Sequence, residues 1–100
     1  MMGEKEYKVI FSRSARNELR DIAFYIALDN PEKSKTFISQ IRQHFSTQLI
    51  KMPLSYRKIK GNVRMIPYKR YGALYCVDER RKLIKILHVF GGGQDWQQKL

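Results

Sequence analysis

The spacing of apolar residues changes once along the chain, and this change restricts the folds that the chain can adopt. Two segments before residue 53 carry apolar residues at intervals of three and four, which is typical of amphipathic helices. The first stripe consists of Ala15, Leu19, Ile22 and Ile26, and the second of Phe37, Ile38, Ile41, Phe45, Leu49 and Met52. After residue 62 the apolar residues alternate or run together, which is typical of strands.

Local signals place the ends of the expected elements. Residues 7–11 alternate between apolar and polar and predict a first strand, after which Ser12 or Ser14 can cap a helix. Asn30 followed by Pro31 predicts the start of a second helix, because the N–H that proline lacks would have no partner at the first helical position. Strands are then predicted at residues 63–66, 71–77 and 83–90.

Helices that are separated in sequence from a mostly antiparallel sheet define an α+β fold. We expect the order β-α-α-β-β-β, in which an N-terminal strand and a helical hairpin precede a three-stranded antiparallel meander. Both helices should pack on one face of the sheet. The chain of 100 residues is long enough for one modest core, so residues 1–100 should form a single domain. Strict alternation in the last strand would put on one face Ile84, Ile86, His88 and Phe90.

The charge of the chain restricts its partners. Its 20 Lys and Arg residues exceed the 9 Asp and Glu residues by 11, which favours nucleic acid or an acidic protein as partner. No apolar run approaches the roughly 20 residues that span a bilayer. The start, "MMGEKEYK", contains no apolar signal region, and the single Cys76 can form no internal disulfide. We therefore expect a cytoplasmic protein that does not act at a membrane.

Two kinds of ligand site are not supported by the motifs. The stretch "GGGQDW" at residues 91–96 lacks the Lys-Ser/Thr pair of a Walker loop and the spaced glycines of a dinucleotide fold. We interpret its glycines as a flexible exit from the last strand. His44 and His88 lie on different expected elements, and Cys76 has no neighbouring cysteine. We therefore expect neither a metal ion nor another cofactor.

Acid–base cleavage of RNA is a chemistry that the residue types would allow. It needs a base for the 2′-OH, cations for the phosphate and an acid for the leaving oxygen. Any basic protein with 6 tyrosines offers such groups, so the pattern has little specificity. The candidates are Arg57, Lys58, Lys60, Arg64, Tyr68, Lys69, Arg70, Tyr71, Tyr75 and His88.

Four segments in a fixed order carry a resemblance to a known family. They read "YKVIFSRSARNELRDIAFYIA", "NPEKSKTFISQI", "MPLSYRKIKGNVRMIPYKRYGALYCVD" and "IKILHVFGGGQDW", and they cover nearly the whole chain. Together they resemble the RelE/ParE superfamily of bacterial toxins from type II toxin–antitoxin pairs. The resemblance implies a toxin that a cognate antitoxin neutralises. For a RelE-like member the resemblance implies a ribosome-dependent messenger-RNA endonuclease. For a ParE-like member it implies an inhibitor of DNA gyrase.

Two positions favour the ParE-like branch. RelE-like nucleases tend to carry an arginine after the first Tyr of a "YRLVY"-like strand, where this chain has Gly72 in "YGALY". They carry another just after the last strand, where this chain has residues 91–94, "GGGQ". Loss of an arginine aimed at developing phosphate charge costs roughly 10²-fold or more in rate. We therefore expect a gyrase inhibitor with no chemistry of its own, with a ribosome-dependent endonuclease as the alternative and a non-toxic binding module as a third hypothesis.

These hypotheses assign roles to overlapping sets of residues. The expected contacts with the gyrase–DNA complex are Arg57, Lys58, Arg64, Lys69, Arg70 and Trp96. For the nuclease alternative the catalytic candidates are Arg57, Lys58, Arg64, Tyr75, His88 and Trp96. An acidic, partly disordered antitoxin segment would fold on binding and form a hetero-oligomer with the toxin. Its expected contacts are Leu19, Ile22, Ile26, Phe37, Ile41 and Phe45. Trp96 is expected to anchor the C-terminus, either on the sheet or on a partner.

Overall fold

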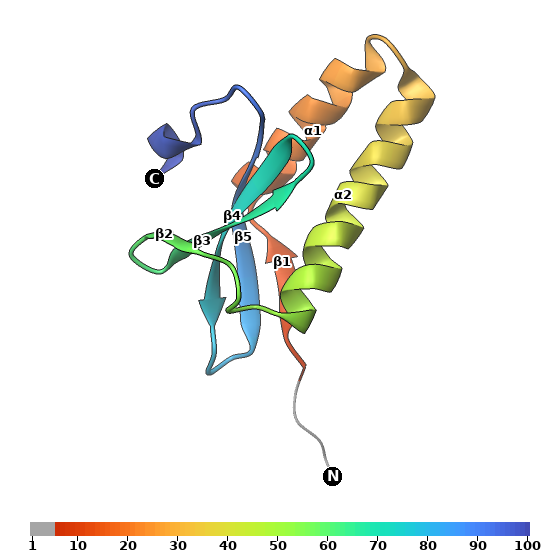
Figure 1. The fold of residues 1–100 in the computed structure, drawn as a ribbon. Helices are drawn as coiled ribbons and strands as arrows, with labels where there is room; N and C mark the ends of the chain where they lie inside the picture. Colours follow the sequence, from red (N-terminus) through yellow and green to blue (C-terminus); the bar gives the residue numbers. More distant parts are fainter. Residues whose placement is uncertain (1–5) are drawn as a thin grey trace.

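The computed structural model describes residues 6–100, and in these the predicted order of elements is confirmed (Figure 1). The elements are β1 (Lys8–Phe11), α1 (Arg13–Ala27), α2 (Pro31–Lys51), β2 (Lys58–Lys60), β3 (Val63–Tyr68), β4 (Tyr71–Asp78), β5 (Leu83–Gly91) and the 3-10 helix η1 (Trp96–Lys99). The short strand β2 was not predicted. The proposed lack of a signal region rests largely on residues 1–5, which lie outside the described residues.

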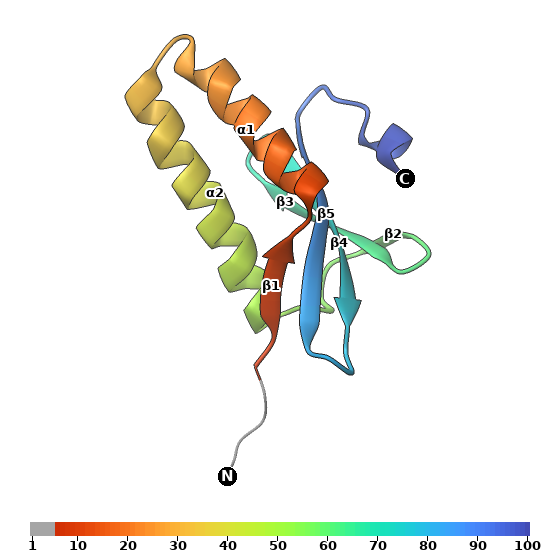
Figure 2. The same ribbon diagram turned by 180° about the vertical axis from the view of Figure 1, so that it is seen from behind.

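The strands form one sheet in the order β1-β5-β4-β3-β2. The expected meander of β3, β4 and β5 is antiparallel, and β1 pairs with β5 in parallel. Both helices cover one face of this sheet, and the turn that joins them lies beyond the ends of the strands (Figures 1 and 2). The α+β fold is therefore confirmed, with a fifth strand at one edge.

The helices begin where the local signals predicted. Ser12, rather than Ser14, caps α1, and its Oγ accepts a hydrogen bond of 3.0 Å from the backbone N–H of Ala15. The side chain of Asn30 accepts a bond of 3.0 Å from the N–H of Lys33, and α2 starts at the following proline. Replacing such a cap by alanine costs about 1 kcal/mol, so these residues also stabilise the hairpin.

The apolar stripes of both helices meet the sheet in one core. Fully buried side chains of α2, such as Ile41, Phe45 and Leu49, pack with Ile66 of β3 and Tyr75 of β4. Burying a side chain of this size stabilises the fold by about 1.5–3 kcal/mol.

No helix in residues 6–100 combines the length and apolar character that crossing a membrane requires.

The strict alternation predicted for the last strand is wrong. Leu87 stands as an extra residue between the partners of Leu74 and Tyr75, which makes a β-bulge in β5. The bulge reverses the faces of the residues that follow it. Val89 therefore joins the core, whereas His88 is half-buried outside it.

Candidate functional site

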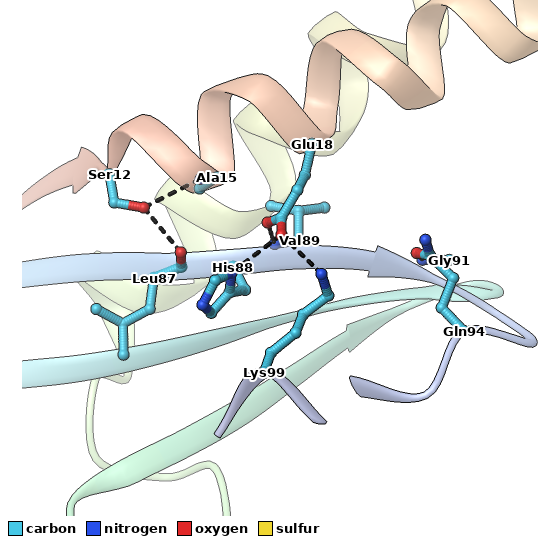
Figure 3. A network of polar contacts seen from close by, with 9 residues as sticks. All are labelled: Ser12, Ala15, Glu18, Leu87, His88, Val89, Gly91, Gln94 and Lys99. Carbon is cyan, nitrogen blue, oxygen red and sulfur yellow. Dashed lines mark hydrogen bonds and ion pairs between the residues drawn. The ribbon is translucent and has the colours of Figure 1, made fainter. Parts of the chain in front are cut away.

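A hydrogen-bond network joins α1 to the exposed edge of β5. β1 ends at Phe11, whereas β5 continues to residue 91. Beyond the end of β1, the start of α1 therefore lies beside β5. Ser12 Oγ donates to the carbonyl of Leu87 (2.7 Å), and the N–H of Val89 donates to Glu18 Oε1 (2.8 Å). Figure 3 shows both contacts on one side of the strand. Side chains of α1 thus satisfy backbone groups that a longer β1 would have satisfied.

The carboxylate of Glu18 also binds two basic side chains. Its Oε2 lies 3.0 Å from Nδ1 of His88 and 2.8 Å from Nζ of Lys99, which comes from η1 (Figure 3). Burial raises the pKa of Glu18, but the bonds from Lys99, the N–H of Val89 and His88 outweigh it, so that its pKa lies below the ordinary value. The ionised carboxylate therefore ties the C-terminal segment to α1. The sequence analysis identified His88 but missed Glu18 and Lys99.

The C-terminal segment is also held by apolar contact. The ring of Trp96 packs on that of Phe90, with 6.0 Å between centroids. Gln94 Oε1 accepts from the N–H of Gly91 (2.6 Å), and Asp95 accepts from the N–H of Gln97 (3.2 Å). Of the two predicted anchoring modes, Trp96 adopts the one on the sheet.

Close contacts surround two of the glycines that stand where the resemblance to RelE-like nucleases led us to expect arginine. A Cβ on Gly72 would lie 2.7 Å from Cζ of Phe90, so the phenyl ring fills the space that a side chain would need. A Cβ on Gly92 would lie 2.9 Å from the carbonyl oxygen of Arg70. Gly93 has a φ of +94°, which L side chains rarely adopt. A side chain at Gly72 would displace the ring of Phe90, one at Gly92 would meet backbone, and one at Gly93 would be strained.

Two of the candidate residues hold the loop that follows α2. Nη1 of Arg64 donates to the carbonyls of Leu54 (3.0 Å) and Tyr56 (2.6 Å). The hydroxyl of Tyr75 donates to the carbonyl of Pro53 (2.9 Å). Tyr75 is fully buried, and burial raises its pKa to about 12 against the opposing charge of Arg64. A substrate cannot reach Tyr75 in this structure, which corrects its assignment as a catalytic candidate.

Four of the remaining cationic candidates are exposed and fall into two groups, whereas Lys60, also exposed, lies at the end of β2. Arg57 and Lys58 lie at the start of β2, where Lys58 is the register partner of Arg64 on β3. Lys69 and Arg70 form the turn between β3 and β4, at the other end of β3. A strand rises about 3.3 Å per residue, so the groups are separated by roughly 15 Å. Lys69 has a φ of 55° in this turn.

Two open cavities lie between α1 and the β3–β4 turn. Their volumes are about 680 and 530 Å³. Tyr25, Arg70 and Tyr71 line both, so the cavities share one wall. The other charged residues in the walls are Asp29, Lys33 and Lys69 in the first cavity, and Glu18 and Asp21 in the second. The paired cavities are thus basic at one end and acidic at the other.

The predicted antitoxin contacts divide between these cavities and the core. Leu19, Ile41 and Phe45 are at most 2% exposed, so an antitoxin cannot reach their side chains, and the prediction needs correction for these three. Ile26 and Phe37 line the first cavity, and Ile22 lines the second.

Within residues 6–100, no group of three or more His, Cys, Asp or Glu side chains is placed to hold a metal ion.

A five-stranded sheet with a helical hairpin on one face is also the fold of several solved toxins. A chain from the chromosomal ParDE toxin–antitoxin system of P. aeruginosa is 20% identical, with a TM-score of 0.74, over 87% of this chain and 97% of that one. A chain of the RelBE2 complex of Mycobacterium tuberculosis is 19% identical, with a TM-score of 0.66, over 89% and 94% of the two chains. The isolated E. coli RelE toxin is 14% identical, with a TM-score of 0.62, over 93% and 92%. These similarities show the fold.

The sequence itself identifies the family. A sequence model of a protein family, described as the ParE toxin of the type II toxin–antitoxin system parDE, matches residues 9–96. The chain therefore belongs to the ParE toxin family, and its predicted membership of the RelE/ParE superfamily is confirmed. No curated protein matches the sequence significantly.

Proposed function

We propose that this toxin inhibits DNA gyrase in the cytoplasm by binding, without chemistry of its own, and that a cognate antitoxin silences it. The observation that carries the proposal is the packing of Phe90 against Gly72. The position at which a nuclease would carry a phosphate-binding arginine is filled by a ring that supports Trp96. A cation at position 72, of the kind that a cleavage reaction would use, would therefore have to displace the ring of Phe90.

The other nuclease candidates support the same conclusion. Arg64 and Tyr75 direct polar atoms at the loop after α2, and Nδ1 of His88 lies against Glu18. A general acid or base must lie within hydrogen-bond reach of the reacting group. Residues whose polar atoms are occupied by the protein fit a structural role better than proton transfer.

The two exposed cationic groups suit an extended anionic target. Arg57 and Lys58 lie at one end of β3, and Lys69 and Arg70 lie at the other. A separation of roughly 15 Å suits contacts with several successive phosphates of DNA, whose axial spacing is about 3.4 Å per strand. We infer that these residues meet DNA in the gyrase complex.

The two cavities suit an antitoxin segment. Solved relatives include toxin–antitoxin complexes of the RelBE and ParDE systems, and we infer the same kind of partner here. Ile22, Ile26 and Phe37 offer apolar contacts within the cavities. The cationic end, with Lys33 and Lys69, would attract carboxylates of a segment that folds on binding.

A supercoiling assay tests the gyrase proposal. Purified gyrase acts on relaxed plasmid in the presence of the full chain, freed from any antitoxin. We expect blocked supercoiling with accumulation of linear DNA. Full supercoiling at excess protein, with near-ultraviolet circular dichroism showing a folded chain, would refute the proposal. Messenger-RNA cleavage on ribosomes under the same conditions would support the alternative.

Matched charge variants locate the contact. Lys69→Asn with Arg70→Gln removes two positive charges from the β3–β4 turn. Arg80→Gln with Arg81→Gln removes the same charge from the β4–β5 turn, where both side chains are exposed. We expect the first pair to weaken inhibition and the second to leave it close to the wild-type level. Equal inhibition by both variants would exclude a specific role for the β3–β4 turn.

A further inference from the structure

The wall that the two cavities share is aromatic as well as cationic. It consists of Tyr25 from α1, Arg70 from the β3–β4 turn and Tyr71 from the start of β4. Figure 1 shows this turn beside α1. The side chain of Tyr25 is 76% exposed, so its ring is not part of the core. An exposed ring in the wall of a cavity offers a flat apolar surface on which a ligand can stack.

The second ring of this wall is held in position by its neighbours. The ring of Tyr71 packs on that of Phe37 from α2, with 4.7 Å between the centroids and 50° between the planes. A Cβ on Gly91 would lie 3.3 Å from Cε1 of Tyr71, so the ring also lies against the end of β5. Tyr71 nevertheless remains half-buried and lines both cavities. A ring that is already oriented loses little conformational entropy when a ligand binds to it.

Positive charge is concentrated in the first cavity, beside these rings. Lys33, Lys69 and Arg70 line this cavity together with one carboxylate, that of Asp29. The ion pairs found in residues 6–100 involve none of these four residues. In the second cavity the carboxylates outnumber the cations. An anionic group of a ligand would therefore lie in the first cavity, and an uncharged part could lie against the shared wall.

Aromatic rings next to cations are the features with which proteins bind single-stranded nucleic acid. A base can stack on Tyr25 or Tyr71 only when it is not already paired and stacked in a duplex. The volume of the first cavity, about 680 Å³, lies within the range of about 300–1,000 Å³ typical of sites for small organic ligands, so it can hold one nucleotide. A carboxylate of a peptide would use the cations but not the faces of the rings.

We propose that the first cavity binds one unpaired nucleotide of a single DNA strand. Its base stacks on the shared wall, against Tyr25 and Tyr71. Its phosphate is held by Lys33, Lys69 and Arg70. The inference rests on the proposed contact of the β3–β4 turn with DNA in the gyrase complex, and it adds an unpaired base to that contact. The proposed antitoxin segment would cover the same walls, so the strand binds only to toxin that is free of antitoxin.

Binding of an oligonucleotide in the absence of gyrase tests this inference. The probe is a fluorescein-labelled oligothymidylate of about 12 nucleotides, within the size range of single-strand sites. Fluorescence anisotropy with the full chain, freed from antitoxin, measures its Kd. Tyr25→Leu removes the ring without changing the charge and should weaken binding about tenfold, as for the loss of one base–aromatic stack. Tyr25→Trp keeps an aromatic ring and should retain binding.

The neighbouring residue provides a matched control. Phe24 is 69% exposed on the same helix and lines neither cavity. Phe24→Leu therefore removes a ring of similar exposure and should change Kd by less than about twofold, as expected for a residue outside the contact. An equal loss of binding in Phe24→Leu and Tyr25→Leu would overturn the inference. So would an equal effect of Tyr25→Leu on a duplex of the same length.

Fluorescence reports the stacking directly, because a base stacked on an indole ring quenches its emission. The wild-type chain contains one tryptophan, Trp96, which lines neither cavity. The oligonucleotide should quench Tyr25→Trp strongly, and it should quench Phe24→Trp and the wild type much less. Equal quenching of the two variants would contradict a stack at position 25.

Charge variants test the position of the phosphate. Lys33→Gln with Lys69→Asn should weaken binding and reduce the slope of log Kd against log salt by about 1.4, from about 0.7 for each cation that meets a phosphate of a single strand. Arg80→Gln with Arg81→Gln removes the same charge from the β4–β5 turn and should leave this slope unchanged. Equal slopes in the two variants would show attraction by net charge and overturn the assigned phosphate contact.

Competitors identify the source of the nucleotide. Thymidine monophosphate should displace the oligonucleotide only at a far higher concentration, and displacement at equal concentration would replace the strand by a free nucleotide. An RNA strand that binds more tightly than DNA, with the same dependence on Tyr25, would overturn the choice of DNA.

The supercoiling assay is run separately with the same protein. Inhibition of gyrase without oligonucleotide binding would refute this inference alone, whereas oligonucleotide binding without inhibition would refute the gyrase proposal alone.

Discussion

Replacing Glu18 by glutamine tests whether one carboxylate holds the C-terminal segment in place. In the wild-type chain the carboxylate accepts from the N–H of Val89 at 2.8 Å and binds Lys99 at 2.8 Å and His88 at 3.0 Å. Glutamine has nearly the same shape and can still accept from Val89. Its amide group is a donor, however, and cannot replace the charged acceptor that faces Lys99.

The size of the effect follows from these contacts. Hydrogen bonds to charged groups contribute about 1.5–3 kcal/mol, and the partly exposed positions of Glu18 and Lys99 reduce this value. We therefore expect Glu18→Gln to lower the free energy of unfolding by about 1–2 kcal/mol at neutral pH. For a chain of this length, each kcal/mol corresponds to a fall in Tm of roughly 4–8 °C.

The pH dependence provides a second test. The folded-state pKa of Glu18 lies below its ordinary value of 4.5, because the bonds to Lys99, Val89 and His88 outweigh the effect of burial. Ionised Glu18 therefore stabilises the fold above its ordinary pKa, and this stabilisation is lost as the pH falls through the lowered value. The difference between wild type and Glu18→Gln should be largest at neutral pH and should disappear in acid.

The assay uses the single tryptophan of the chain. Urea unfolding followed by circular dichroism gives the free energy, and the fluorescence of Trp96 reports whether the C-terminal segment stays packed on Phe90. Glu18→Gln should shift the emission of Trp96 to the red before global unfolding. Lys99→Met should show most of the same loss, and the double variant little more. Unchanged stability at neutral pH, or a difference that does not vary with pH, would contradict the assigned role of Glu18.

Three further substitutions test the packing around the site. Tyr75→Phe removes the hydrogen bond to the carbonyl of Pro53 and should cost about 1–2 kcal/mol in urea unfolding, whereas an unchanged midpoint would contradict the buried contact. Gly72→Ala places a methyl group against Phe90 and should cost about 1–3 kcal/mol, a loss that Phe90→Leu should partly restore in the double variant. Lys69→Asn keeps a residue that tolerates positive φ, so stability should change by less than about 0.5 kcal/mol while gyrase inhibition weakens; a folding defect would show that Lys69 acts through packing instead.

Signals that act over a few residues were sufficient for much of the fold. The cap at Ser12 and the Asn30–Pro31 start of α2 each involve a backbone group three residues away, so composition and spacing contain the whole interaction. The two apolar stripes were likewise visible in the spacing. The same stripes gave a wrong prediction for part of the antitoxin surface, because the apolar face of a helix in a small domain usually packs into the core. Leu19 and Phe45 are buried for that reason.

Interactions between distant residues were not predictable. Glu18 and Lys99 are 81 residues apart and belong to no motif, and only the docking of α1 on β5 brings them together. The bulge at Leu87 depends on how β5 pairs with β4, so alternation read along one strand could not detect it. Gly72 was recognised as a missing arginine, but only the packed structure places the ring of Phe90 there.

The class of fold and the strongly basic character of this protein can be read from its sequence, because periodicity, capping and charge are properties of neighbouring residues or of simple sums. The family can be read from the order of its sequence segments. Which of its cations are available to a partner depends on how the chain folds. Arg64 holds a loop, whereas Lys69 and Arg70 remain exposed on a turn. The physical reason is that a charged side chain binds either its own backbone or another molecule, and this choice depends on contacts between segments far apart in the chain.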